Sequence, residues 1–170
     1  KRWMYEESLV MPLVIRWPGV VEPGSINDDI VSNLDFAETF LDIAGAGIPR
    51  EMQGRSFLPI LKGRTPADWR KTFYYHYYEF PGAHSVARHY GVTDGHYKLI
   101  NFYENKDWEM FDLTADPNEL QSIYGRKEYV GIQSRLEKEL VRLRQYYRVP
   151  NKDPDSTRPK PRPKRTNKKK

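Results

Sequence analysis

The chain of 170 residues contains no cysteine. This absence excludes disulfide bonds, thiolate nucleophiles and zinc sites built on cysteine. No apolar run approaches the length of about 18 residues that a membrane-spanning helix needs, so no transmembrane segment is expected. The chain also lacks a basic segment followed by an apolar run, the pattern of a signal peptide.

The net charge of +5 is unevenly distributed along the chain. Residues 152–170 hold nine of the 28 Lys and Arg residues and two of the 23 acidic ones, so residues 1–151 carry a net charge of −2. Residues 151–170 contain no aliphatic or aromatic side chain, and such a segment cannot bury enough surface to offset the loss of chain entropy. We therefore expect residues 151–170 to be a disordered basic tail.

Two roles are open for this tail. It can bind polyanions such as anionic glycans, or it can simply keep the chain soluble, which is the interpretation we favour. No nucleic acid is expected as a partner, because no aromatic residues are interleaved with the basic ones for base stacking.

Residues 1–70 show the patterns of one strand and one helix. Residues 12–17 are mostly apolar and bounded by prolines, which predicts a strand in a sheet buried on both faces. Without neighbouring strands, this segment predicts an exposed apolar patch. Asp35 is predicted as the N-cap of a helix, with Glu38 as its capping-box partner and Gly45 at its end. The packed face of this helix would consist of Phe36, Phe40, Leu41 and Ala44.

Residues 71–150 predict a smaller α+β unit. Four segments have the composition of antiparallel strands, at residues 71–79, 85–92, 96–103 and 108–113. Thr93-Asp94-Gly95 is a hairpin signal between the second and the third. Apolar residues spaced three or four apart then run from Tyr129 to Tyr147, which predicts an amphipathic helix. We expect this helix to cover one face of a four-stranded antiparallel sheet.

Several motifs occur in the same order as in a known enzyme family. They are KRWMYEES, MPL and IRWPG in residues 1–19, SNLDFAETFLDIAG in 32–45, MQGRSFLPIL in 52–61, HYYEFP, RHYGV and YKLI in 76–100, and WE, FDL, DP and EL in 108–120. Together they resemble the carbohydrate sulfatases of the alkaline-phosphatase-like superfamily. The resemblance implies an α/β parent fold and hydrolysis of sulfate esters or sulfamates on sugars, including glycosaminoglycans, in a periplasmic or extracellular enzyme.

The resemblance also implies a formylglycine nucleophile, made from the Cys or Ser of a C/S-x-P-x-R motif, and a calcium site. Neither motif occurs in these residues. We therefore expect the C-terminal third of a sulfatase, beginning in the loop of the active-site lysine, with residues 1–70 at the end of the catalytic α/β domain. Such a fragment is expected to be inactive without the missing N-terminal part. The alternative is a non-catalytic, polyanion-binding α+β module with a basic tail.

Four residues are candidates for the substrate site, and none for a metal site. By resemblance, Lys1 corresponds to the lysine that contacts the sulfate, where an ammonium charge would stabilise the transition state. Arg2 is expected to contact the sugar or its substituents, or else to form a surface ion pair with Glu6 or Glu7. His84 and His89 are placed on one strand, and at five residues apart they would point to opposite faces. Each either binds the sugar or is a packed or surface histidine.

Two further features bear on the structure around this site. Asp116-Pro117 and Glu119 are interpreted as a turn that opens a helix, with Glu119 in its first turn, rather than as metal ligands. Val10 stands where the resembling sequences usually carry an arginine, and a valine has no donors to replace those of the guanidinium. We expect this departure to weaken the hold on the lysine loop.

Overall fold

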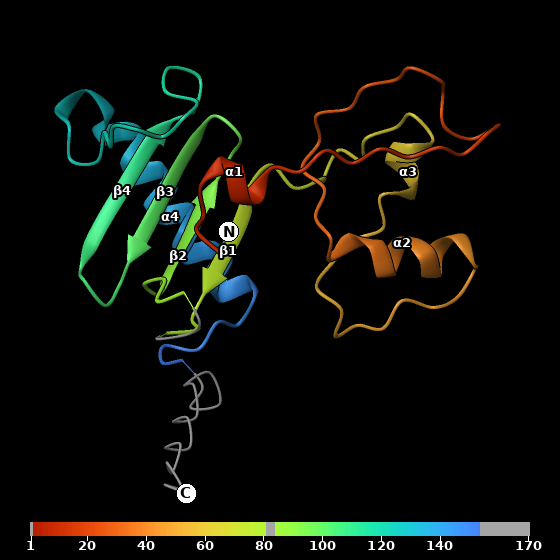
Figure 1. Ribbon diagram of the computed structural model, residues 1–170. Helices are drawn as coiled ribbons and strands as arrows, with labels where there is room; N and C mark the ends of the chain where they lie inside the picture. Colours follow the sequence, from red (N-terminus) through yellow and green to blue (C-terminus); the bar gives the residue numbers. More distant parts are fainter. Residues whose placement is uncertain (1, 81–83, 154–170) are drawn as a thin grey trace, which may run out of the picture.

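The computed structural model describes residues 2–80 and 84–153. A four-stranded antiparallel sheet with one long helix behind it forms one part, and an arm made of residues 10–70 extends from its edge (Figure 1). The predictions for Lys1 and for the basic tail from residue 154 onward lie outside the described residues. No helix among the described residues is long and apolar enough to cross a membrane.

The sheet follows chain order. Its strands are β1 (Phe73–Tyr77), β2 (His89–Thr93), β3 (Tyr97–Phe102) and β4 (Asp107–Asp112), each antiparallel to the next. The predicted hairpin between β2 and β3 is confirmed. Gly95 takes the left-handed conformation there (φ +84°), and the Asp94 carboxylate accepts hydrogen bonds from the backbone N–H groups of His96 and Tyr97, at 3.0 and 2.7 Å.

The predicted helix covers one face of the sheet, as expected. A 3₁₀ turn, η1 (Lys127–Tyr129), leads into α4 (Val130–Tyr146). The buried leucines of α4 pack against one residue from each of β2, β3 and β4, which gives the main core: Val92, Leu99, Met110, Leu136, Leu140 and Leu143.

The other face of the sheet is covered by the N-terminal segment. Met4 is fully buried against Ile100 and Phe111, and the short helix α1 (Glu6–Leu9) follows it. Gly91 makes this approach possible, because a Cβ at that position would lie 2.5 Å from Met4 Sδ and even closer to the Leu99 carbonyl oxygen. Different segments therefore cover the two faces of the sheet: α4 covers one face, and residues 2–9 cover the other.

The predicted strand at residues 12–17 is wrong. This segment runs as irregular chain in the arm, and it pairs with no strand among the described residues (Figure 1). A strand of this kind forms only when neighbours satisfy its backbone groups, and none of the four described strands lies beside residues 12–17. The exposed apolar patch that was expected is present: Val14 is 89% exposed and Ile26 90%, with Val10, Met11 and Leu13 also exposed.

The helix predicted within residues 1–70 is confirmed as α2 (Asp35–Ile43). Its predicted cap is wrong, and its predicted packed face is correct only in part, since Phe36 packs against Phe57. Leu34 occupies the N-cap position, and Asp35 is the first helical residue. The buried side chains are polar, namely Asp35, Glu38 and Thr39, while Phe40 is 67% exposed. They are buried because the following chain crosses over them: Thr39 Oγ1 accepts a hydrogen bond from the Phe57 N–H, just before the short helix α3 (Leu58–Leu61).

Candidate functional site

The N-terminal segment and strand β2 meet at a buried histidine. The His89 side chain is fully buried, and the Trp3 ring stacks on its imidazole with centroids 5.6 Å apart and planes inclined by 18°. Tyr75, Tyr77 and Phe102 surround the same ring at centroid distances of 5.7, 5.7 and 5.2 Å. An aromatic cage therefore holds His89 on the face of the sheet opposite α4.

One nitrogen of His89 has a partner and the other has none. Nδ1 lies 2.8 Å from the Ala87 carbonyl oxygen, so it carries the proton and donates. Burial lowers the pKa of His89 below its ordinary value, so the ring is neutral at pH 7. Nε2 is then a bare acceptor, and it is buried with no hydrogen-bond partner among the described residues. Buried polar atoms normally have a hydrogen-bond partner, so a donor outside the described residues is expected for Nε2.

Arg2 contacts the aromatic cage around His89 through its backbone. Its carbonyl oxygen accepts a hydrogen bond of 2.9 Å from the Tyr75 hydroxyl, and its backbone is left-handed (φ +81°). Burial raises the pKa of Tyr75, and the positive charge of Arg2 works in the opposite direction. The expected alternative, an ion pair of Arg2 with Glu6 or Glu7, is not formed within residues 2–80 and 84–153, and Glu6 pairs with Lys98.

The structure separates the two candidate histidines. Strand β2 begins at His89, later than predicted, so the placement of His84 on this strand is wrong. The His84 side chain is exposed in a turn outside the sheet. Of the four candidates, Arg2 and His89 both contact Tyr75, whereas Lys1 lies outside the described residues.

A buried ion cluster fixes the N-terminal segment to the sheet, and it was not predicted. Lys98 Nζ, with a fully buried side chain, lies 2.6 Å from Glu6 Oε1 and 2.7 Å from Glu119 Oε1. Glu119 Oε2 accepts a hydrogen bond of 2.6 Å from the Glu6 backbone N–H. The interpretation of Glu119 as a residue in a helical first turn is therefore wrong, since the next helical turn begins at Lys127. A lysine within the apolar run of β3 was the available signal.

His76 lies in a separate polar cluster, on the face of the sheet that α4 covers and not on the face of His89. Its Nε2 is 3.7 Å from Asp153 Oδ1, and Arg88 Nη1 reaches Asp153 Oδ2 at 3.4 Å and Glu104 at 3.3 Å. Burial lowers the pKa of His76 to about 4, although the Asp153 carboxylate opposes the shift.

This lowered pKa predicts a loss of stability in mild acid. The unfolded chain takes up a proton on His76 near pH 6.5, whereas the folded chain does so only near pH 4. Stability should therefore fall as the pH decreases from 6.5 to 4, by up to about 3 kcal/mol, and level off below. Urea unfolding at several pH values measures this decrease. It should be reduced in His76→Gln and retained in the exposed control His84→Gln; an unchanged decrease in His76→Gln would refute the assignment.

No group of three or more His, Asp or Glu side chains in the described part of the chain is arranged to hold a metal ion. The site thus consists of an aromatic cage around a neutral histidine, an arginine beside it and an ion cluster that holds the segment in place.

Comparison with known proteins places the chain among the sulfatases. Residues 1–146 match the family model described as N-sulphoglucosamine sulphohydrolase, C-terminal, and the chain belongs to this family. It is thus the C-terminal region of a carbohydrate sulfatase, with the four-stranded sheet and C-terminal helix of that region.

Particular relatives narrow the comparison. The chain is 49% identical over 158 residues to an N-acetylglucosamine-6-O-sulfatase of Bacteroides thetaiotaomicron, covering 91% of this chain and 28% of that protein. Human arylsulfatase K is 33% identical over 129 residues, which is 72% of this chain and 24% of the relative. The solved structure of BT4656 in complex with its substrate D-glucosamine-2-N,6-O-disulfate superposes with a TM-score of 0.85 at 47% identity, covering 88% of this chain and 31% of that one. The chain spans less than a third of each.

Proposed function

We propose that this chain forms the C-terminal part of a sulfatase that hydrolyses a sulfate ester or sulfamate on a glucosamine-type sugar. Family membership supports the reaction class, and the substrate named for BT4656 supports the sugar class. The proposed position of the sugar site rests on Nε2 of His89. This buried acceptor has no partner in the described residues, and a sugar hydroxyl is a donor of the right kind.

The other candidates have distinct proposed roles. The guanidinium of Arg2 suits a sulfate or carboxylate group on the sugar, since it donates two parallel hydrogen bonds. Lys1, the neighbour of Arg2 in sequence, is proposed to bind the sulfate that is removed, where its charge would stabilise the transition state. His84, which is exposed, is proposed to contact the substrate only from outside the cage.

The residues of this site do not fit the calcium site that the sulfatase resemblance implies. Calcium takes about six to eight oxygen ligands, whereas the side chains around His89 are aromatic. The nearby carboxylates of Glu109 and Glu119 are already bonded to Tyr5 and Lys98. The chain also has no cysteine and no Ser-x-Pro-x-Arg motif for a formylglycine. We assign no step through either group to these residues.

The remainder of a sulfatase domain is the proposed partner of the arm, and the source of the nucleophile and the metal ligands. The exposed apolar side chains of Val14 and Ile26 support this proposal, because such residues are normally covered. The chain alone is accordingly proposed to be inactive, and sulfate release by the isolated chain would contradict this.

Replacing His89 by phenylalanine in the complete protein tests the assignment. Phenylalanine keeps the stacking with Trp3 and Phe102 but removes the Nε2 acceptor. We expect kcat/KM for sulfate release from glucosamine 6-sulfate or N-sulfate to fall about 10- to 100-fold, because one hydrogen bond to the substrate is lost. Tm should fall moderately, because the Ala87 carbonyl oxygen also loses its donor.

The matched variant is His89→Gln, whose amide oxygen can accept a hydrogen bond, and it should recover part of the activity. Equal activity of His89→Phe and the unaltered protein would place the sugar site elsewhere. A large fall in Tm without a change in kcat/KM would make His89 a purely structural residue.

A further inference from the structure

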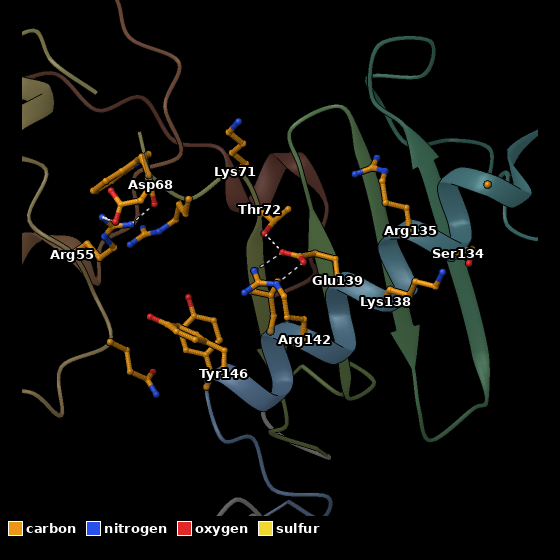
Figure 2. Close-up of a pocket in the computed structure, with 16 residues that line it drawn as sticks. Arg55, Asp68, Lys71, Thr72, Ser134, Arg135, Lys138, Glu139, Arg142 and Tyr146 are labelled. Carbon is orange, nitrogen blue, oxygen red and sulfur yellow. Dashed lines mark hydrogen bonds and ion pairs between the residues drawn. The ribbon is translucent and has the colours of Figure 1, made fainter. Parts of the chain in front are cut away.

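A groove of about 940 Å³ lies between the arm and helix α4 (Figure 2). One wall comes from the arm and the chain leading into β1, including Arg55, Asp68 and Lys71, and the other from α4, including Lys138 and Arg142. Because α4 covers the sheet face opposite Met4 and His89, this groove is distinct from the aromatic cage.

The walls of the groove are strongly basic. Six cationic side chains contribute to them: Arg55, Arg70, Lys71, Arg135, Lys138 and Arg142. Only two carboxylates do so, Asp68 and Glu139. Residues 1–151 carry a net charge of −2, so the positive charge is concentrated here rather than spread over the fold. A concave surface lined by one sign of charge attracts polyanions.

Four of these cations, all arginines, form ion pairs, and the two lysines form none among the described residues. Arg55 pairs with Asp68 at 2.9 Å, Arg142 with Glu139 at 2.7 Å, Arg135 with Asp94 and Arg70 with Asp35. Neither lysine, 71 or 138, has an acidic partner within 4.0 Å among residues 2–80 and 84–153. Their ammonium groups, one on each wall in Figure 2, are available to an anion.

The two walls of the groove are hydrogen-bonded to each other, and one end of the groove is aromatic. Thr72 donates a hydrogen bond of 2.5 Å to Glu139, which Arg142 also holds, so α4 is tied to the start of β1. Tyr146 is 66% exposed and packs edge-on against Tyr147, with ring centroids 4.9 Å apart. An exposed tyrosine ring offers an apolar face and a polar rim, which suits the apolar face of a sugar ring.

We propose that this groove binds a linear anionic polysaccharide, with its sulfate or carboxylate groups against Lys71 and Lys138 and a sugar ring against Tyr146. The choice of a glycan rests on the proposed sulfatase function. The bound segment is a part of the polymer away from the sugar that reaches His89, so the groove raises the affinity for long chains and not for monosaccharides.

The test uses the complete protein with Lys71→Gln and Lys138→Gln combined, and Lys106→Gln with Lys127→Gln as the control. The control removes the same charge from two exposed positions outside the groove. On immobilised heparin the groove variant should elute at a lower NaCl concentration than the control. Its KM for a sulfated polysaccharide should rise about five- to tenfold, with KM for the monosaccharide unchanged. Tyr146→Ser should raise KM for the polysaccharide without any change in charge.

Each other outcome has a definite meaning. Elution and KM equal to those of the control would overturn the groove proposal and leave the sulfatase function intact. Early elution from heparin in a protein that releases no sulfate from any sugar would retain the groove and refute the proposed function. An equal loss of retention on phosphocellulose would overturn the assignment to a glycan, because that matrix offers phosphate groups in place of sulfated sugars.

Discussion

Replacing Glu119 by alanine should lower the free energy of unfolding by about 3–5 kcal/mol, because it removes one of the two carboxylates that hold the buried Lys98 ammonium. Lys98 would keep only Glu6, whose side chain is 29% exposed, and the Glu6 backbone N–H would lose its acceptor. Urea unfolding, followed by tryptophan fluorescence, measures the change.

The paired substitution separates charge burial from lost packing. Lys98→Met with Glu119→Ala removes the buried ammonium together with its partner, and replacing a buried ion pair by apolar groups is often close to neutral. The double variant should therefore recover most of the loss. A Glu119→Ala protein within about 1 kcal/mol of the unaltered one would show that the ion cluster does not form in solution.

The second large effect is expected at Asp35. Replacing Asp35 by alanine should also lower the free energy of unfolding by about 3–5 kcal/mol. Its buried carboxylate accepts hydrogen bonds from the backbone N–H groups of Ser32 and Arg55, at 2.7 and 2.8 Å, and from both terminal nitrogens of the Arg70 guanidinium. Alanine would leave two backbone donors and one largely buried cation without their acceptor. Thermal unfolding of the complete protein measures the loss.

Arg70→Ala is the matched variant for this site. It leaves the Asp35 carboxylate with its two backbone donors, so it should cost less than Asp35→Ala. If the two variants lose the same amount, the stabilisation lies in the ion pair alone and the backbone hydrogen bonds contribute little.

The elements predicted correctly are those whose signals are local. The hairpin at Asp94-Gly95 needs a left-handed glycine and a carboxylate within a few residues, and α4 needs only its own apolar spacing. The prediction of a strand at residues 12–17 was wrong because an apolar run becomes a strand only beside another strand. No neighbouring strand for this segment exists among the described residues.

The candidate site was predictable only in part. Arg2 and His89 came from the sulfatase resemblance, and the structure brings both to Tyr75. The ion cluster was missed because Lys98 and Glu119 lie 21 residues apart, a separation at which sequence spacing carries no signal. The polar face of α2 was missed for a similar reason, since Asp35 is bonded to residues 20 and 35 positions further on.

The bond between the Glu6 N–H and Glu119 joins residues 113 positions apart, which has a consequence for the order of folding. Met4 likewise needs Phe111 in place before its side chain is covered. Closing so long a loop is slow compared with forming hairpins or a helix, so the sheet and α4 should assemble before residues 2–9 dock. During synthesis, the corner around His89 would form only after β4 and Glu119 have left the ribosome, and the first residues of the segment would be among the last to reach their place.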